Sequence, residues 1–343
     1  MKPKTSEEIL KYKISPQRVL YSATHQEIIE GLTTDVYFLR SREILEKERL
    51  DKVRVTAEIF TSKQGILAGV EEALNLLSSL EVEAWALPEG EKMDKKEVVM
   101  RIEGAYGEFA VYETALLGLL ASSSGWATAA RECVEEARGR QVISFGARHI
   151  HPAVAPVMER AAIIGGAQGC SCILGAKLLD KEPIGTVPHA AFLVVGDTVK
   201  VAETFDEIMP GDVPRIILVD TFKDEAEEAL RVAFALKDKL LGVRLDTPGE
   251  RGGVTPGLVM EVRARLDLEG YKHVKILVSG GITPQRMPEL IEGGADSFGV
   301  GSYIARASAI DMTMDLKEIE GRPLAKRGRI PGKTENPRLK KVL

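Results

Sequence analysis

Polar and charged side chains stand at the ends of several apolar runs in the second half of the chain. Arg148 follows "ISF", Asp220 follows "IILV", Ser279 follows "KILV", and "VRLD" contains Arg244 and Asp246. Residues two apart in a strand point to the same side, so Arg244 and Asp246 can act together. Arginine can hold phosphate or pyrophosphate, and aspartate can accept hydrogen bonds from sugar hydroxyls or bind Mg²⁺. A structural ion pair is the alternative for these two residues, and a purely structural role is also open for Asp220.

Two glycine-rich segments predict a phosphate site. "VSGGITP" contains Gly280 and Gly281, and "SFGVGSYI" contains Gly299, Gly301 and Ser302. Glycine lets backbone N–H groups approach an anion closely, and the last two loops of an α/β barrel commonly bind phosphate. We therefore expect a phosphorylated ligand here. The alternative is that the glycines only turn the chain.

The stretch "SFGARHIHP" combines an aromatic ring with a planar cation. Phe145 stands three residues before Arg148. Stacking on the ring and bidentate pairing with the guanidinium would recognise an aromatic acid. A core position for the phenylalanine is the alternative, and we expect His149 and His151 at the surface or at a helix start.

One histidine, His189, is placed in "GTVPHAAFLVV", behind a Gly-Thr turn and Pro188. The apolar residues 190–195 predict a buried strand with His189 at its mouth. A neutral imidazole is a competent nucleophile at pH 7. The residues alone favour a buried structural histidine, and a role of His189 as a nucleophile is the open alternative.

Other motifs are too incomplete to predict chemistry. Cys133, Cys170 and Cys172 are too few and too unevenly spaced for a disulfide framework, and "CSC" and "HIHP" lack the spacing of a zinc site. We expect these cysteines to be small buried residues. "GKT" near the C-terminus is not a P-loop, because Gly328 and Gly332 enclose only three residues.

The elements that must position these residues fall into two regions. In the first, residues 53–60 alternate as a strand, 66–80 have helical spacing, 82–93 and 97–110 supply further strands with turns, and 112–139 form a long helical stretch. This pattern predicts an α+β sandwich.

From Gln141 onward, short apolar runs alternate with helical patterns, which predicts parallel βα units in a barrel or an open doubly wound sheet. The expected strands are 141–145, 190–195, 215–220, 240–246, 274–281 and 297–302, with helices at 223–240 and 255–270.

The predicted fold is therefore α/β, with an N-terminal α+β sandwich domain at residues 1–121 followed by an incomplete α/β (TIM-like) barrel at 122–302. The second region is shorter than the roughly 250 residues of a complete barrel. We expect the tail, 303–343, to pack back on the first domain, with its basic end, 326–343, irregular.

Charge and hydropathy limit the possible partners. The net charge of −5 and the pI of about 5.8 argue against nucleic acid or an anionic membrane as the main partner. The N-terminus lacks the apolar core of a signal peptide, and "TALLGLLASSSGWATAA" is too short and too rich in serine to span a membrane comfortably. We predict a cytoplasmic protein.

Taken in order, the motifs resemble the nicotinate phosphoribosyltransferase family, which is related to the nicotinamide and quinolinate phosphoribosyltransferases. The resemblance rests on "TTDVY", "ETALLGLLASSSGWATAAR", "FGAR", "GTVPHA", "VDTF", "VRLD", "SGGI" and "FGVGS", and covers nearly the whole chain. It implies transfer of phosphoribosyl from phosphoribosyl pyrophosphate to nicotinate with Mg²⁺, in NAD salvage.

The resemblance also implies roles for particular residues. Phe145 would stack on the pyridine ring, with Tyr37 of a partner subunit on its other face and Asp35 close by. Arg148 would bind the carboxylate. Arg244 and Asp246 would hold the phosphoribosyl group, Asp220 and Asp246 are the candidate Mg²⁺ ligands, and Thr186, Ser279 and the glycine loops with Ser302 would complete the substrate site.

By the same resemblance, His189 in "GTVPH" would be phosphorylated by ATP as a co-substrate, and the enzyme would be a homodimer or higher homo-oligomer with shared active sites. Two alternatives remain. A quinolinate phosphoribosyltransferase would need more cationic side chains than "FGARHIH" supplies and has no use for His189. A non-catalytic protein that binds a phosphoribosyl ligand would be expected to lack Arg244 or Asp246, and both are present.

Overall fold

The computed structural model describes residues 5–343, which form two compact units. Of the described residues, unit 1 comprises 5–128 and 308–343, and unit 2 comprises 129–307. A 24-residue helix, α6 (Glu113–Glu136), contains the point at which the chain passes from unit 1 to unit 2. Within residues 5–343, no helix is long and apolar enough to cross a membrane.

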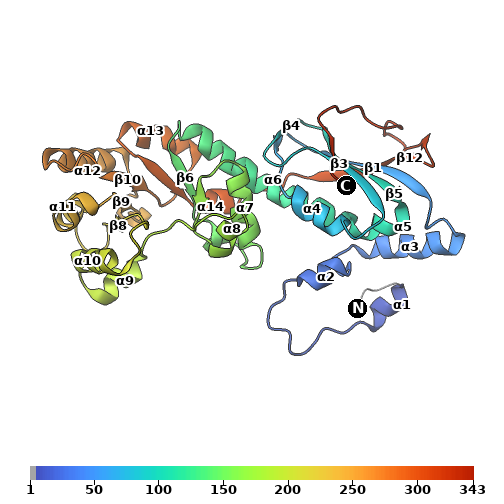
Figure 1. The fold of residues 1–343 in the computed structure, drawn as a ribbon, viewed down its shortest axis with the longest axis horizontal. Coiled ribbons are helices and arrows are strands. Elements are labelled where there is room, and N and C mark those ends of the chain that lie inside the picture. Colours follow the sequence, from blue (N-terminus) through green and yellow to red (C-terminus); the bar gives the residue numbers. More distant parts are fainter. Residues whose placement is uncertain (1–4) are drawn as a thin grey trace. The chain divides into compact units, whose positions relative to one another are not determined.

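Unit 1 is built on a six-stranded antiparallel sheet with the order β13-β12-β1-β5-β3-β14 (Figure 1). The strands are β1 (Arg54–Thr61), β3 (Val82–Ala86), β5 (Val98–Ala105), β12 (Met312–Ile319), β13 (Arg322–Pro323) and β14 (Lys340–Lys341). A separate pair joins β2 (Gly65–Ile66) to β4 (Lys92–Met93). Buried residues of β1 and β5 pack with those of α4 (Val70–Leu77) and α6 in the core of this unit.

The remaining helices of unit 1 are short, apart from α3. They are α1 (Ser6–Lys11), α2 (His25–Ile29), α3 (Val36–Glu48), α5 (Tyr106–Phe109) and the 3₁₀ turn η1 (Ala110–Tyr112). The helix expected at 66–80 is shorter, because residues 65 and 66 pair as β2 and α4 begins after Gly69.

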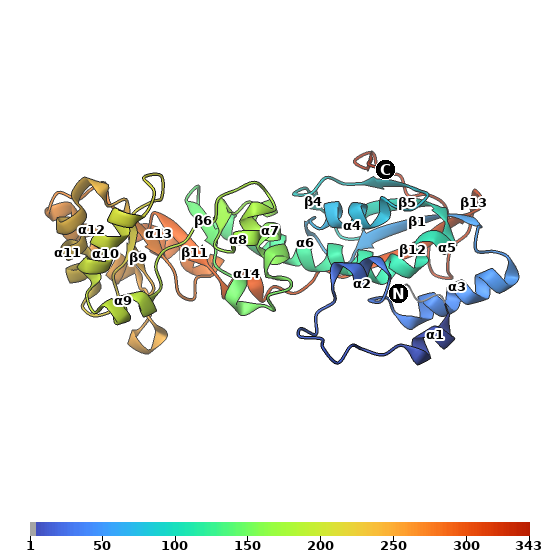
Figure 2. The same ribbon diagram turned by 60° about the horizontal axis from the view of Figure 1, so that its bottom comes forward.

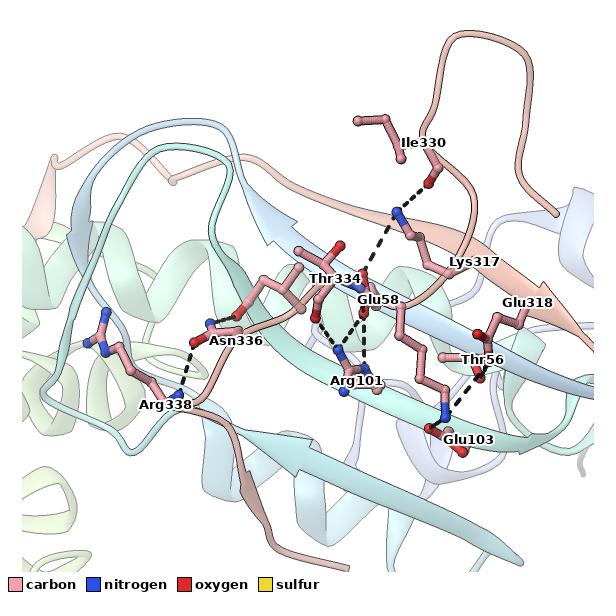
Figure 3. A network of polar contacts seen from close by, with 12 residues as sticks. Thr56, Glu58, Arg101, Glu103, Lys317, Glu318, Ile330, Thr334, Asn336 and Arg338 are labelled. Atoms are coloured by element: carbon pink, nitrogen blue, oxygen red, sulfur yellow. Dashed lines mark hydrogen bonds and ion pairs between the residues drawn. The ribbon is translucent and has the colours of Figure 1, made fainter. Parts of the chain in front are cut away.

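The C-terminal tail is fixed to the polar face of this sheet by a buried carboxylate (Figure 3). Glu58 of β1 is 1% exposed, and its Oε1 accepts hydrogen bonds from Arg101 Nε at 2.9 Å and Nη2 at 2.7 Å. The same oxygen accepts the Thr334 backbone N–H at 2.9 Å. Farther along the tail, Arg338 Nη1 lies 2.8 Å from Glu97 Oε1. The tail is thus held by specific contacts although it contains little regular structure.

Unit 2 contains a six-stranded parallel sheet with the order β7-β6-β11-β10-β9-β8 (Figures 1 and 2). The strands are β6 (Gln141–Ser144), β7 (Gly169–Cys170), β8 (Ile216–Leu218), β9 (Gly242–Leu245), β10 (Lys275–Val278) and β11 (Ser297–Val300). The edge strands β7 and β8 do not pair, so the sheet curls without closing. The predicted fold class, a sandwich domain followed by an incomplete α/β barrel, is confirmed.

Helices connect the parallel strands. They are α7 (Ala155–Ile164), α8 (Ile173–Lys177), α9 (His189–Val195), α10 (Thr198–Ile208), α11 (Glu225–Leu236), α12 (Pro256–Leu268), α13 (Met287–Glu292) and α14 (Ser302–Ala305), with 3₁₀ turns η2 (Ala147–His149), η3 (Lys237–Lys239), η4 (Gly249–Arg251) and η5 (Pro284–Arg286). Along one side of β8, β9 and β10, helices α10, α11 and α12 lie next to one another (Figure 1).

The strand predicted at 190–195 is wrong, because these residues form helix α9. Pro188 caps its start, and Gly196 ends it in the left-handed conformation, with φ of 90° and its N–H bonded to the Phe192 carbonyl. Of the helix residues only Phe192 is buried, whereas Val194 is 87% exposed. The apolar run therefore did not mark a strand buried on both faces.

Strands β2, β7, β12, β13 and β14 were not predicted. β12 lies inside the segment treated as a tail and pairs with β1 over Met312–Ile319. Its apolar and polar residues alternate, which is the pattern of a half-buried strand. β7 has only two residues, too few to produce a pattern.

Candidate active site

A pocket of about 400 Å³ opens at the carboxyl ends of the unit 2 strands. Parallel strands end at one edge of their sheet, so the loops that follow them meet there. The lining comes from the loop after β6, from β8 and β9, and from the segment that leads into α9. It consists of Phe145, Ala147, Arg148, Ser171, Gly185, Thr186, Pro188, His189, Ala190, Leu218, Arg244 and Asp246.

Arg244 is the most connected side chain of the pocket. Its Nε donates to Ser279 Oγ at 2.8 Å, Nη1 donates to Thr186 Oγ1 at 2.9 Å, and Nη2 donates to Asp246 Oδ2 at 3.1 Å. Its guanidinium carbon lies 5.1 Å from the centroid of the Phe145 ring, within cation–π range. Burial lowers the pKa of Arg244, and the charges of Asp246 and Asp220 oppose this change. The guanidinium is therefore held in one orientation before any ligand binds.

Two carboxylates, Asp220 and Asp246, lie beside this arginine. Asp220 Oδ2 accepts the Asp246 backbone N–H at 3.1 Å, and Asp246 Oδ1 lies 2.9 Å from Ser279 Oγ. Burial raises the pKa of Asp220 and the charge of Asp246 adds to the rise, while His189 opposes it. The Asp220 side chain is only 1% exposed, and its Oδ1 has no hydrogen-bond partner among the described residues.

The unpartnered Asp220 oxygen fits a cation. Buried polar groups are normally hydrogen-bonded, so this exception calls for a partner. Within residues 5–343, no group of three or more His, Cys, Asp or Glu side chains is arranged to hold a metal ion. Two carboxylates still suit Mg²⁺, which typically takes its other ligands from water and substrate phosphates.

His189 begins α9 and faces both carboxylates. Its Nδ1 lies 3.0 Å from Thr221 Oγ1, and its Nε2 lies 3.8 Å from Asp220 Oδ1 and 3.9 Å from Asp246 Oδ2. The side chain is 38% exposed, so it is more open than a buried structural histidine. It lies at the pocket, as predicted, on a helix start rather than a strand end.

The glycine loops follow β10 and β11 at the same edge of the sheet. Gly280 and Gly281 have φ of 84° and 63°, which side chains rarely adopt, and Arg286 Nη1 donates to the Gly281 carbonyl at 2.9 Å. A Cβ at Gly299 would lie 2.4 Å from Phe145 Cε2, and one at Gly301 would lie 3.0 Å from the Phe145 carbonyl oxygen. These two glycines thus leave room for Phe145. Binding of phosphate at the loops and at Ser302 stays a prediction.

Arg148 extends into the pocket from the turn η2. It is exposed and makes no hydrogen bond or ion pair that is seen in the described part of the chain. A guanidinium without an anionic partner in a pocket can bind a ligand carboxylate. Binding of a substrate carboxylate by Arg148 stays a prediction.

Asp35 and Tyr37 belong to unit 1 and are not among the residues that line this pocket. Asp35 precedes α3, and its Oδ2 accepts the Thr114 hydroxyl at 3.1 Å. Tyr37 is 53% exposed. Their contribution to a partner subunit's site stays a prediction.

Several supporting residues were not foreseen from the sequence. Thr221 contacts His189, Arg286 holds the Gly280–Gly281 loop, and the buried Glu159 accepts the Ala147 backbone N–H at 2.8 Å. The signal for Glu159 was the charged pair Glu159 and Arg160 inside the otherwise apolar helix "APVMERAAII". The cysteines are free, with Cys133 and Cys170 buried and Cys172 partly exposed.

Comparisons with known proteins identify a family over most of the chain. The models "Quinolinate phosphoribosyl transferase, N-terminal domain" and "C-terminal domain" match residues 35–124 and 126–315. A crystal structure titled nicotinate-nucleotide pyrophosphorylase, from Pyrococcus furiosus, is 46% identical with a TM-score of 0.87, over 92% of this chain and 82% of that chain.

Curated relatives carry two different names. A nicotinate phosphoribosyltransferase from Mycobacterium tuberculosis is 30% identical over 70% of this chain and 52% of its own length, so the chain spans about half of that relative. A probable nicotinate-nucleotide pyrophosphorylase (carboxylating) from Methanothermobacter thermautotrophicus is 24% identical over 85% of this chain and 99% of its own length.

These comparisons correct the predicted function. The transfer of phosphoribosyl to nicotinate, stimulated by ATP through a phosphohistidine, is contradicted by the quinolinate-type models over both domains and by the 46% identical pyrophosphorylase. The alternative weighed against it, quinolinate phosphoribosyl transfer, is better supported. The argument from the few cationic residues in "FGARHIH" failed because it counted one loop, whereas Arg244 reaches the same pocket from β9.

Proposed function

This chain belongs to the quinolinate phosphoribosyl transferase family, and we propose that it transfers phosphoribosyl from phosphoribosyl pyrophosphate to quinolinate. The ring nitrogen of quinolinate attacks C1 of the ribose as pyrophosphate leaves. The carboxylate beside that nitrogen then departs as CO₂, and a proton takes its place on the ring carbon. The products are nicotinate mononucleotide, pyrophosphate and CO₂. The match to both family domains, 35–124 and 126–315, carries this proposal.

The pocket provides groups of the right chemistry for a pyridine dicarboxylate. Phe145 supplies an aromatic face, and Arg148 is a guanidinium without an anionic partner among the described residues. A stacked ring and a bidentate carboxylate pair would fix the orientation of the ring nitrogen. Correct orientation is a large part of the rate enhancement when two substrates must meet.

Arg244 and Asp246 would hold the phosphoribosyl group. The guanidinium is already fixed by Ser279, Thr186 and Asp246, so little reorganisation is needed when a negatively charged ligand arrives. The 5-phosphate would bind at Gly280, Gly281, Gly299, Gly301 and Ser302, which lie at or after the ends of the neighbouring strands β10 and β11.

Asp220 and Asp246 are the residues that would hold Mg²⁺. When bound, this ion would neutralise charge on the pyrophosphate as it leaves. The buried Asp220 Oδ1, which accepts no hydrogen bond from the described residues, supports the assignment. Asp220 also accepts the Asp246 backbone N–H, which orients the second carboxylate.

The proposal also includes a shared active site. A homodimer or higher homo-oligomer would allow Asp35 and Tyr37 to complete the pocket of a neighbouring subunit, since both residues lie outside unit 2.

The decisive experiment compares pyridine substrates. The protein is incubated with phosphoribosyl pyrophosphate, Mg²⁺ and either quinolinate or nicotinate, and pyrophosphate and CO₂ are quantified. We expect quinolinate to yield one CO₂ per pyrophosphate and nicotinate to react much more slowly. Efficient turnover of nicotinate, with none of quinolinate, would refute the proposal.

A further inference from the structure

A buried carboxyl group lies directly beneath the turn that carries Arg148. Glu159 of α7 is 0% exposed, and its Oε1 accepts the backbone N–H of Ala147 at 2.8 Å. Ala147 is the first residue of η2 and immediately precedes Arg148. The second oxygen, Oε2, makes no hydrogen bond within residues 5–343. None of the steps of the proposed reaction uses this carboxyl group.

The turn is held tightly on both sides. The Phe145 N–H donates to the Val300 carbonyl at 2.7 Å, and a Cβ at Gly146 would lie 2.6 Å from Met158 Cε. Glu159 itself is confined, because a Cβ at Gly175 would lie 2.8 Å from Glu159 Cβ. A movement of the carboxyl group would therefore move Ala147 and the neighbouring side chain of Arg148.

The charge of Glu159 is not balanced by a cation in the contacts that hold it. The groups that face it are the Ser144 hydroxyl from β6, the Cys170 thiol from β7 and the backbone N–H groups of Gly146 and Ala147. From α8, Gly175 approaches without a titratable side chain. Burial raises the pKa of Glu159 to about 7, and these neighbouring polar groups oppose the rise. Burial, with the charge of Glu159, raises the pKa of Cys170 to about 12, so the thiol stays neutral near pH 7.

Resting on the proposed function, we propose that Glu159 is a positioning residue for the pyridine substrate, whose ionised carboxylate holds the turn from Phe145 to Arg148 in the geometry that binds ring and carboxylate. An ionised carboxylate is the stronger acceptor for the Ala147 N–H. A protonated one must also place its hydroxyl hydrogen in the same enclosed space. The binding-competent turn is thus favoured when the proton is absent.

The direction of the pH dependence follows because the ionised form of Glu159 favours the binding-competent turn. The ionised fraction falls from about nine tenths at pH 8 to about one tenth at pH 6 for a pKa near 7, and apparent affinity scales with the competent fraction. Affinity for the pyridine carboxylate should therefore weaken by about tenfold from pH 8 to pH 6. Affinity for phosphoribosyl pyrophosphate should change much less, because its proposed ligands lie on other loops.

The test measures binding by calorimetry, from pH 5.5 to 8.5, for quinolinate, nicotinate and, separately, phosphoribosyl pyrophosphate with Mg²⁺. Glu159→Gln keeps the shape and the acceptor oxygen but cannot ionise. We expect it to flatten the dependence of pyridine carboxylate affinity on pH, while binding of phosphoribosyl pyrophosphate keeps its wild-type profile. Glu228→Gln is the matched control, since Glu228 is equally buried in unit 2 but pairs with Arg231 away from the pocket.

A folded Glu159→Gln variant that retains the wild-type pH profile would overturn the proposal, as would equal weakening of both kinds of ligand. Amide hydrogen exchange of the wild-type segment 145–149 gives a readout that does not depend on the variant's folding. Protection of the Ala147 N–H should fall below pH 7 after correction for the intrinsic exchange rate, and unchanged protection would contradict the role. The binding test uses both quinolinate and nicotinate and does not require turnover. If quinolinate is not turned over, the role of Glu159 in binding a pyridine carboxylate can therefore still be tested.

Discussion

Replacing Gly299 by alanine would insert a methyl group against the ring of Phe145. Gly299 lies in β11, and a Cβ there would be 2.4 Å from Phe145 Cε2, 2.6 Å from Cδ2 and 3.2 Å from Ser279 Cβ. The φ angle of Gly299 is not positive, so alanine would not strain the backbone. The perturbation is therefore confined to the ring and its surroundings.

The distances set the size of the effect. Carbon atoms pack favourably at about 3.5 Å or more, so the ring must move by about 1 Å. A misplacement of about 1 Å in a substrate-binding group can cost about 100-fold in rate, or about 2.7 kcal/mol in transition-state stabilisation. Overpacking should also destabilise the fold, by about 1 to 3 kcal/mol.

Steady-state kinetics with quinolinate and phosphoribosyl pyrophosphate would measure the loss in kcat/KM, alongside thermal unfolding of both proteins. Gly211→Ala is the control, because a Cβ at that exposed loop glycine would meet nothing within 4 Å. If Gly299→Ala folds and keeps kcat/KM within a factor of about three of the wild type, the Phe145 ring does not position the substrate.

Three further predictions follow from individual contacts. Arg148→Ala should lose about 2 to 5 kcal/mol of binding free energy for the pyridine carboxylate and little for phosphoribosyl pyrophosphate; equal losses for both, measured by calorimetry, would contradict its assignment. Arg101→Met removes two hydrogen bonds to the buried Glu58 and should lower the free energy of unfolding by about 3 to 5 kcal/mol in urea titrations. The control Arg54→Met breaks an exposed pair with Glu83 and should lower it by less than about 1 kcal/mol. If the two variants are equally stable, the network of Figure 3 does not anchor the tail. Because the proposed reaction contains no phosphohistidine step, [γ-³²P]ATP should leave no acid-labile label on the protein; a label on the wild type that the folded His189→Asn variant lacks would contradict this expectation.

The site could be predicted from the sequence where a residue's position follows from strand direction. Asp246 and Ser279 directly follow two neighbouring parallel strands, and Arg244 lies near the end of the first, so their side chains meet at one edge. Asp220 was found by the same argument and contacts the Asp246 backbone. Apolar runs and the residues directly after them were sufficient for this part of the pocket.

Contacts that depend on tertiary packing could not be predicted in this way. The run 190–195 is as apolar as a buried strand, but it forms a short helix. This helix begins after Pro188 and ends at Gly196, which is in the left-handed conformation. Glu159 reaches the Ala147 N–H from a different element, and no local pattern indicates that contact. β12 was not predicted, because its single run of alternating residues, Met312–Ile319, adjoins a basic end of the chain that is rich in proline and glycine, and its partner β1 is distant in the sequence.

The most direct test of the account is a crystal structure with Mg²⁺, phosphoribosyl pyrophosphate and phthalate, which carries the two adjacent carboxylates of quinolinate but lacks the ring nitrogen and cannot react. We predict phthalate against Phe145 with a carboxylate on Arg148, the ribose and pyrophosphate at Arg244 and Asp246, and the ion between Asp220 or Asp246 and the pyrophosphate. Electron density for phthalate or phosphoribosyl pyrophosphate at another place in unit 2, with this pocket empty, would contradict the central claim.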